Sequence, residues 1–492
     1  MSNTAFDLRT SAASALTVAL CASTSADWIP ATVFPIAPQS QGCAGAAIAA
    51  AQAPTSTASS FGAVTGTIWM GAPFASANAR QSGVIEAWTF DSVTLEWQFN
   101  GMFASSQPQA GGGFGATIAH SGSVLVAGSP RARGAVSQAP LGRECGGKAE
   151  VFGNVTYLNP VGILGTQLVP TPETRGGDQF GSAVAVRPAS DGSGSRVFVS
   201  SPGADNGTAA DSGRVHSFRF VTDVGWQQAM AFTMPKPAPS DKLGAAIATD
   251  GDRVFASIDR NGGAVAVFGA AGAEPLYEGT LPAPVVAGAP AMGFGRAMDH
   301  DGAFLVVGAP GAYGQPADEG TVFVLDAAPP HAVRTVITSP FEGECLGFGA
   351  AVSLRLGTLV VGTSSATDEA RDGKVAVYDF NQDTGEVTLR SVHAGEAETS
   401  FGSVVVTTGW HVAMGAPTAG AALSGKVRTE SVRVGPRSPD LNGDGVVSGA
   451  DVGILVGMFR GLAENSPGDL NFDLSVDGAD LAILLGAWGP VP

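Results

Sequence analysis

The sequence predicts an all-β protein, a seven-bladed β-propeller of four-stranded blades, followed by a small α-helical module. Glycine and proline, with 68 and 31 residues, make up about a fifth of the 492 residues, which argues against long helices. Seven copies of a strand-rich repeat fill the middle of the chain, and two copies of an acidic loop end it. Apolar residues account for 44% of the chain, enough to bury a large core.

The charge balance restricts the class of partner. The chain has 26 Lys and Arg against 43 Asp and Glu, a formal net charge of -17. A negative charge of this size repels phosphate backbones and anionic lipid surfaces, and it favours cations as small ligands. We therefore expect no nucleic-acid partner. We also expect no membrane span, because no stretch approaches about eighteen consecutive apolar residues.

Residues 1–26 have the pattern of a signal peptide. Arg9 is the only cation, a run of small and apolar residues covers 12–22, and small residues continue to Ala26. We expect cleavage after Ala26 and a secreted or cell-surface protein. Cys21 would suggest lipid attachment, but Leu20 stands where that signal needs a small residue, so soluble export is favoured.

Each copy of the repeat begins with Phe-Gly or Leu-Gly. An alternating segment, a turn and an apolar run follow, and the run ends in Gly-Ala-Pro or a variant of it. A second glycine then opens another strand. The seven copies begin at Phe61, Phe114, Phe180, Leu243, Phe294, Phe348 and Phe401. The period of about 57 residues leaves room for four short strands.

The copy at Phe294 illustrates the physical interpretation. A first strand is followed by the tight turn at His300, a buried strand over 303–308, and Pro310, which cannot donate to a ladder. One such sheet cannot bury both of its faces, so we expect radial stacking, with Phe as the packing residue and Gly allowing close backbone approach. At these motifs the sequence resembles the FG-GAP repeats of integrin alpha-like propellers and of many bacterial secreted proteins. The resemblance covers roughly residues 28–434 and implies seven blades.

The ends of the propeller, residues 27–435, are expected to join. The seventh copy leaves almost no chain for a fourth strand before Pro436. Residues 27–34 resemble the outer strands that contain Trp97 and Trp226. We therefore predict that residues 28–38 complete the last blade, which protects an edge that would otherwise be exposed.

Two acidic loops, 440–451 and 469–480, begin the C-terminal domain at 436–492. Aligning 440–460 with 469–489 gives 11 identical positions in 21, which indicates a duplicated unit. Oxygen ligands at loop positions 1, 3, 5, 9 and 12, with a carbonyl from position 7, are the arrangement that surrounds calcium. The predicted ligands of the first loop are Asp440, Asn442, Asp444, the Val446 carbonyl, Ser448 and Asp451. Those of the second loop are Asp469, Asn471, Asp473, the Ser475 carbonyl, Asp477 and Asp480.

Each loop leads into an amphipathic helix, predicted over 452–460 and 481–488. The two loop-helix units resemble a type I dockerin with paired EF-hand-type loops, which implies calcium-dependent binding to a cohesin-like protein or cell-surface component. Two acidic turns without metal are the alternative, which is disfavoured because eight acidic residues and one basic residue lie between Ser438 and Pro492. Leu474 stands where the sharp turn prefers Gly, so we expect weaker binding at the second loop. Positions 10 and 11 are Gly-Ala in both loops, without the hydroxyl groups common in that family.

The sequence contains none of the common catalytic motifs: no Gly-x-Ser-x-Gly, no His-Glu-x-x-His and no phosphate-binding loop. The leading hypothesis is a non-catalytic binding or scaffold protein. The alternative is an extracellular polysaccharide hydrolase or lyase built on the propeller. His120 and His300 occupy equivalent turns, where we expect surface residues rather than a metal pair.

Arg131, Arg133 and Arg143 lie in one long loop of the second copy. In integrin-like propellers the corresponding face meets ligands, and three guanidinium groups suit the carboxylates of an acidic polysaccharide. A solvated loop is the alternative. Three cysteines remain after cleavage, an odd number that excludes a complete disulfide framework. The resemblance brings Cys43 near Cys145, which would allow a disulfide, and leaves Cys345 farther around the ring.

Overall fold

The structure is a computed structural model that describes the ring and much of the C-terminal domain. The described residues are 29–33, 46–52, 66–76, 79–91, 96–132, 146–155, 165–190, 192, 194–260, 262–272, 274–286, 288–311, 319–341, 347–363, 373–382, 384–395, 400–409, 411–419, 425–431, 439, 441, 446–459, 468, 470 and 476–490. The predicted signal peptide at 1–26 lies outside them, as do Cys43, Cys145 and Cys345.

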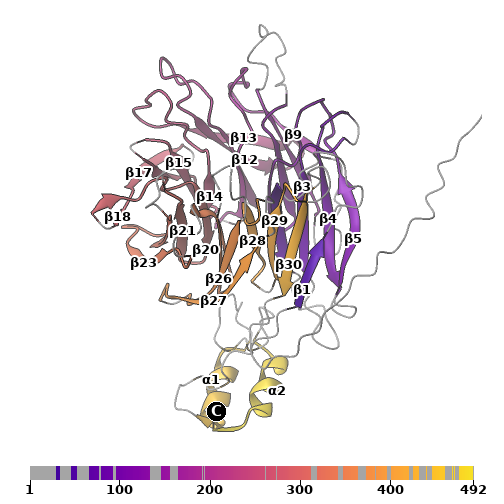
Figure 1. The fold of residues 1–492 in the computed structure, drawn as a ribbon, viewed down its shortest axis with the longest axis vertical. Helices are drawn as coiled ribbons and strands as arrows, with labels where there is room; N and C mark the ends of the chain where they lie inside the picture. The colour runs from indigo at the N-terminus through magenta and orange to yellow at the C-terminus, as the bar shows by residue number, and fades with distance from the viewer. Residues whose placement is uncertain are drawn as a thin grey trace, which may run out of the picture.

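Seven antiparallel four-stranded sheets form the ring, as the sequence predicts (Figure 1). Blades 1 and 2 are β2 Ala47–Gln52, β3 Gly66–Ala72, β4 Val84–Asp91, β5 Glu96–Phe103; and β6 Thr117–Ser121, β7 Val124–Ser129, β8 Lys148–Gly153, β9 Thr166–Leu168. Blades 3 and 4 are β10 Val184–Pro188, β11 Ser195–Ser201, β12 Arg214–Val221, β13 Gly225–Phe232; and β14 Ile247–Thr249, β15 Arg253–Ile258, β16 Ala264–Gly269, β17 Leu276–Pro282.

Blades 5 to 7 follow the same order. They are β20 Ala297–Asp301, β21 Phe304–Ala309, β22 Thr321–Asp326, β23 Val333–Thr338; β24 Phe348–Arg355, β25 Thr358–Thr363, β26 Lys374–Phe380, β27 Val387–Ala394; and β28 Val404–Thr407, β29 His411–Ala416, β30 Lys426–Ser431, β1 Ile29–Val33. The first strand of each blade contacts the first strand of the next, and β28 contacts β2. The ring is therefore closed.

The N-terminal strand completes the last blade. β1 pairs with β30 in antiparallel register, from Ile29 opposite Ser431 to Val33 opposite Val427. In Figure 1 the indigo strand β1 lies beside the orange strand β30. The prediction for residues 28–38 is confirmed over Ile29–Val33, and its other residues lie outside the described part of the chain.

The two glycine motifs of the repeat meet where neighbouring blades touch. Gly115 donates its N–H to the carbonyl of Gly128 in its own blade (3.1 Å). Its own carbonyl lies against Gly71 of the preceding blade, so that a Cβ at Gly71 would overlap this oxygen. The same overlap joins Gly128 to Gly181, Gly308 to Gly349 and Gly362 to Gly402. The Phe-Gly and Gly-Ala-Pro motifs are thus two sides of one contact between blades.

The first blade departs from the predicted repeat. Its first strand, β2, ends before Phe61, which lies outside the described residues, whereas the prediction placed that strand after Phe61. Phe61 is only 10 residues before Gly71, but Phe114 is 14 residues before Gly128. Ten residues are too few for a strand and a turn, so the assignment of Phe61 was wrong.

The register shows which residues replace the Phe-Gly pair in the first blade. Ala47 lies opposite Gly71, as Thr117 lies opposite Gly128. Counting back from these strands, Ala44-Gly45 corresponds to the Phe-Gly pair at 114–115. The glycine is retained, and alanine stands in place of the large apolar side chain.

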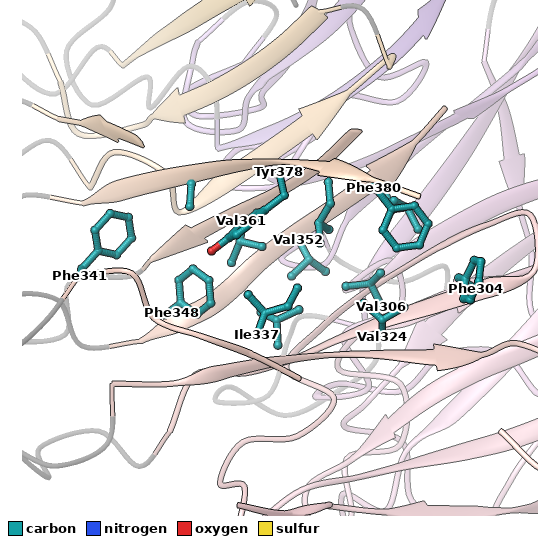
Figure 2. Packing of buried hydrophobic residues seen from close by; sticks show 14 residues of the cluster. Phe304, Val306, Val324, Ile337, Phe341, Phe348, Val352, Val361, Tyr378 and Phe380 are labelled. Carbon is teal, nitrogen blue, oxygen red and sulfur yellow. The ribbon is translucent and has the colours of Figure 1, made fainter. Parts of the chain in front are cut away.

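The core lies between the blades. Figure 2 shows one such interface, where Phe348 and Val352 of blade 6 pack with Val306 and Val324 of blade 5, all buried. The leading Phe or Leu of the other repeats is buried in the same way: Phe114, Phe180, Leu243, Phe294 and Phe401. An additional hairpin, β18 Val285–Val286 with β19 Ala289–Pro290, lies between blades 4 and 5.

The C-terminal domain contains α1 Gly449–Gly457 and α2 Gly478–Gly486, which lie at one end of the molecule in Figure 1. The short strand β31 Val446–Val447 pairs with β32 Gly489–Pro490. Leu455 and Leu484, 29 positions apart, are both fully buried between the helices. Both helices begin three residues earlier than the predicted 452–460 and 481–488.

Candidate functional site

The helices begin early because loop positions 9 and 12 form a capping box. Ser448 and Asp477 are the N-caps, and their side chains accept hydrogen bonds from the backbone N–H groups of Ala450 and Ala479. An N-cap oxygen and an acidic N3 residue satisfy donors that the first helical turn leaves open. The last positions of each predicted calcium loop are therefore already helical.

The position-12 aspartates are fully buried and similarly placed in the two units. Asp451 accepts hydrogen bonds from the backbone N–H groups of Leu441 and Ser448, both at 2.8 Å. Asp480 accepts them from Leu470 (2.6 Å) and Asp477 (2.8 Å). Each carboxylate thus joins the start of its loop to the start of its helix, which brings loop positions 2, 9 and 12 together.

Five of the twelve predicted calcium ligands lie in the described chain: Val446, Ser448, Asp451, Asp477 and Asp480. The other seven lie outside it: Asp440, Asn442, Asp444, Asp469, Asn471, Asp473 and Ser475. Within the described residues alone, no group of three His, Cys, Asp or Glu side chains is arranged to hold a metal ion.

The outer faces of α1 and α2 expose apolar and small residues at equivalent positions. Val456 is 48% exposed and Leu485, 29 positions later, is 51% exposed. Positions 10 and 11 of both loops are exposed and belong to the same faces. Trp488, just after α2, is 56% exposed. The two helices therefore present related apolar surfaces.

The propeller has two faces. We call the loop face the one that carries the connections between second and third strands and between blades, and the turn face the one that carries the turns between first and second strands. On the loop face, the exposed Arg131 lies over the ring of Phe74 from the preceding blade, 4.9 Å from its centroid. Arg133 and Arg143 lie outside the described residues, so of the three predicted ligand-binding residues the structure places Arg131.

On the turn face, the aspartates of blade 5 link it to blade 6. Asp299 accepts a hydrogen bond from the backbone N–H of Leu354 (2.8 Å). Asp301 accepts hydrogen bonds from the backbone N–H of Leu356 (2.9 Å) and from Arg355 Nη1 (3.1 Å). Burial raises the pKa of Asp299. The sequence signal for this network was the Asp-His-Asp-Gly turn at 299–302, whose partners could not be known before the register of the blades.

Arg187 extends this network past a blade. Its Nη2 donates to the carbonyl of His300, which connects blade 3 to blade 5 (2.7 Å). The blade between them has the three-residue first strand β14. Sequence reasoning missed Arg187, because no local motif marks an arginine that reaches two blades along the ring.

Of the two histidines expected at the surface, His300 is buried and His120 is half-buried, and both stack on an aromatic ring of the preceding blade. His120 stacks on Trp69 with ring centroids 4.3 Å apart, and His300 stacks on Phe255 at 6.3 Å. His120 also hydrogen-bonds the Val155 carbonyl (3.1 Å). Burial lowers the pKa of His120 to about 4. His300 is 8% exposed, so the surface assignment was wrong for this residue, and both rings act as packing side chains.

In the described part of the chain, no helix has the length and apolar character needed to cross a membrane.

No family model matches the sequence, and no curated protein matches it. Several solved structures are similar to the chain. The structure of U3-55K has a TM-score of 0.48 at 10% identity and covers 82% of this chain and 98% of its own. Sqt1 from Saccharomyces cerevisiae has a TM-score of 0.40 at 10% identity, covering 78% and 82%. Sqt1 from Chaetomium thermophilum has a TM-score of 0.42 at 13% identity, covering 77% and 81%. The seven-bladed architecture of this chain rests on its own strand pairing.

Proposed function

We propose that this protein is a secreted, non-catalytic binding or scaffold protein. In this proposal the propeller binds a ligand or partner, and the C-terminal domain attaches the protein, in the presence of calcium, to a cohesin-like protein or cell-surface component. The observation that carries it is the paired arrangement of Asp451 and Asp480, buried at equivalent positions between a loop and a helix. The export pattern at 1–26 supports secretion.

The residues present fit calcium. Each loop offers oxygen donors alone: carboxylates, an amide, a backbone carbonyl and, in the first loop, the hydroxyl of Ser448. Hard cations such as calcium prefer this donor set. The carboxylates of Asp451 and Asp480 are buried, and Arg460 is the one basic residue between Ser438 and Pro492. A bound cation would offset the repulsion among these carboxylates and hold each loop against its helix.

The exposed faces of α1 and α2 are the proposed contact with the partner. Val456 and Leu485 would supply apolar contact, and the small residues beside them would allow close approach of the partner's backbone. Because neither helix carries an exposed charged side chain, we expect the partner's contact surface to be apolar as well.

This attachment can be tested with the full chain and a panel of immobilised cohesin modules, in calcium or in a chelator. We expect retention in calcium and release by the chelator. The double substitution Asp451→Asn and Asp480→Asn removes two carboxylates at nearly constant size and should abolish retention. Retention that is equal in calcium and in chelator would exclude the proposed mode of attachment.

For the propeller we propose an acidic polysaccharide as ligand, bound on the loop face near Arg131. The support is the exposed guanidinium over Phe74, together with two further arginines in the same loop sequence. A panel of acidic and neutral polysaccharides should show retention without cleavage. Release of shorter fragments would instead favour the alternative, a hydrolase or lyase.

A further inference from the structure

The interfaces between blades share a pair of equivalent side chains. In each blade a glycine opens the third strand, and the first member of the pair is defined from it. This member lies in the fourth strand of the blade, opposite the second residue after that glycine. The other is the fifth residue after that glycine in the next blade. Between blades 5 and 6 these are Ile337 and Tyr378, which Figure 2 shows in one apolar cluster.

The same positions are apolar at the preceding interfaces. Around the ring the pairs are Phe103 and Phe152, Leu168 and Phe218, Phe232 and Phe268, and Leu281 and Leu325. Each pair lies within one apolar cluster. Between blades 6 and 7 the register puts His393 and Glu430 at these two positions. This interface therefore contains an ionisable pair where its neighbours contain aliphatic and aromatic side chains.

The two side chains are buried side by side, and each has a further polar partner. Nδ1 of His393 lies 3.3 Å from Oε1 of Glu430, and Nε2 lies 3.0 Å from Oγ of Ser391. Arg428 donates to the same Oε1 at 2.6 Å. In a neutral imidazole with its proton on Nδ1, the N–H faces the carboxylate and Nε2 accepts a hydrogen bond from the serine hydroxyl. His393 is 9% exposed and Glu430 2%, so both side chains are buried in the ring.

Few other charges face the pair from the described strands. β1, which pairs with β30, contains no ionisable side chain. In β27, Arg390 pairs with Asp379, and in β26 the ammonium of Lys374 lies over the ring of Phe341. His411 of β29 packs against Phe90 of the first blade. Among the described strands, Arg428 is a charged group in direct contact with the pair, through its hydrogen bond to Glu430.

Protonation of His393 opposes this packing. Burial, and secondarily Arg428, lowers the pKa of His393 to about 4. A histidine in an unfolded chain has a pKa of about 6.5. Between about pH 4 and pH 6.5, His393 is therefore protonated when the interface is separated and neutral when it is packed. The stability contributed by the neutral histidine is present above about pH 6.5 and is lost as the pH falls toward 4. Burial raises the pKa of Glu430, which acts in the opposite direction and limits the effect.

We propose that the His393–Glu430 pair makes the interface between blades 6 and 7 a proton-sensitive closure of the ring, tight at neutral pH and loosened in mild acid. The location matters because β30, which carries Glu430, is also the strand that holds β1. Pro30 lies directly opposite Glu430. Loosening of this interface would therefore expose the strand to which the N-terminal strand is bound.

The neighbouring interface supplies a matched variant. The double substitution His393→Ile and Glu430→Tyr introduces the Ile337 and Tyr378 pair between blades 6 and 7. Hydrogen exchange of the full chain is measured at pH 7.5 and 5.0, corrected for intrinsic rates, with β22 and β23 as internal reference. In the parent protein the protection of β30 and β1 should fall by up to about 30-fold relative to the reference, from the two pKa values above. In the double variant the differential loss should disappear.

Two results would overturn the proposal. One is a differential loss in the double variant equal to that of the parent. The other is increased protection of β30 at pH 5.0 in the parent, which would mean that a protonated His393 strengthens its contact with Glu430. Should the double variant fail to fold, the titration of His393 in the parent decides. Histidine-selective carbon-13 NMR should find a pKa near 4 for His393. A pKa above about 6.5 would exclude the proposed proton-sensitive closure.

Discussion

Gly83 of blade 1 lies against the backbone of Phe114 of blade 2, so close that a Cβ at Gly83 would overlap both its nitrogen and its carbonyl oxygen. The two residues form an isolated parallel bridge, and Gly83 has a φ of 85°. Gly83→Ala should therefore destabilise the protein by about 3 kcal/mol, since it adds a left-handed backbone penalty to a steric overlap between blades. The free energy of unfolding in urea measures this.

Gly122→Ala is the control for that prediction. Gly122 also has a positive φ, 60°, but nothing lies within 4 Å of an added Cβ. We expect it to cost about 1 kcal/mol. Equal effects of the two substitutions would show that backbone conformation, and not contact between blades, determines the need for glycine.

Removal of residues 27–40 should destabilise the whole ring. It deletes β1 and exposes the edge of β30 between Val427 and Ser431. We expect the melting temperature to fall by about 5 °C or more, whereas removal of residues 1–26 alone should leave it unchanged. An equal melting temperature for both deletions would mean that β1 contributes little to closure.

In the second predicted calcium loop, loss of a ligand can be separated from loss of the helix cap. Asp477→Ala removes a predicted ligand and the N-cap of α2, and the lost cap should cost about 1 kcal/mol. Asp477→Ser retains a capping oxygen, as Ser448 does in the first loop. Calcium titration calorimetry and thermal unfolding of the full chain should show the serine variant weaker in calcium affinity than the parent, but more stable than the alanine variant. Asp440→Ala should weaken its site more than either, because position 1 is expected to bind calcium directly and position 9 through water.

His120 should make the protein sensitive to acid. Its pKa is lowered to about 4, mainly by burial. Below about pH 6.5, His120 is therefore protonated in the unfolded chain but stays neutral in the folded protein. The stability is present above pH 6.5 and falls by up to about 3 kcal/mol as the pH approaches 4. In His120→Phe this part of the pH dependence should be absent, and urea unfolding at pH 7 and pH 5 would reveal it. A parallel shift of parent and variant would contradict the assignment.

Replacement of Arg131, Arg133 and Arg143 by alanine should reduce retention on an acidic polysaccharide, because it removes three cations from one loop. The effect should be larger at low salt than at moderate salt, as expected for interactions between exposed charges. Arg175→Ala, on another loop of the same face, serves as a control for general charge. Unchanged retention of the triple variant would remove this loop from the proposed site.

The repeat made most of the ring predictable, because each glycine motif marks a contact that recurs at several interfaces between blades. Gly128 and Gly181, for example, could be assigned from the spacing alone. The first blade could not, since Ala44-Gly45 has lost the large side chain and Phe61-Gly62 imitates it. The contact between His393 and Glu430 could also not be predicted from the sequence. It becomes visible when strand register identifies their equivalents in other blades.

In the C-terminal domain the ligand spacing predicted the loops but placed the helices late. The ligand spacing predicts Ser448 and Asp477 as calcium ligands, and their role as N-caps moves each helix three residues toward the loop. The side chain at position 9 accepts a hydrogen bond from the backbone of its own helix. A pattern of ligand spacing does not show this capping role.

The pairing of Ile29 with Ser431 also sets the order in which the ring can be completed during synthesis. Six blades are built from consecutive strands and can form as their residues become available. The seventh needs both β1, the first strand of the ring to be synthesised, and β30, the last. A nascent or prematurely ended chain that stops before Lys426 leaves β1 without its partner and β29 with an open edge. Such a chain would expose strand edges that invite aggregation or proteolysis, so that completeness of the polypeptide is itself a condition for a closed ring.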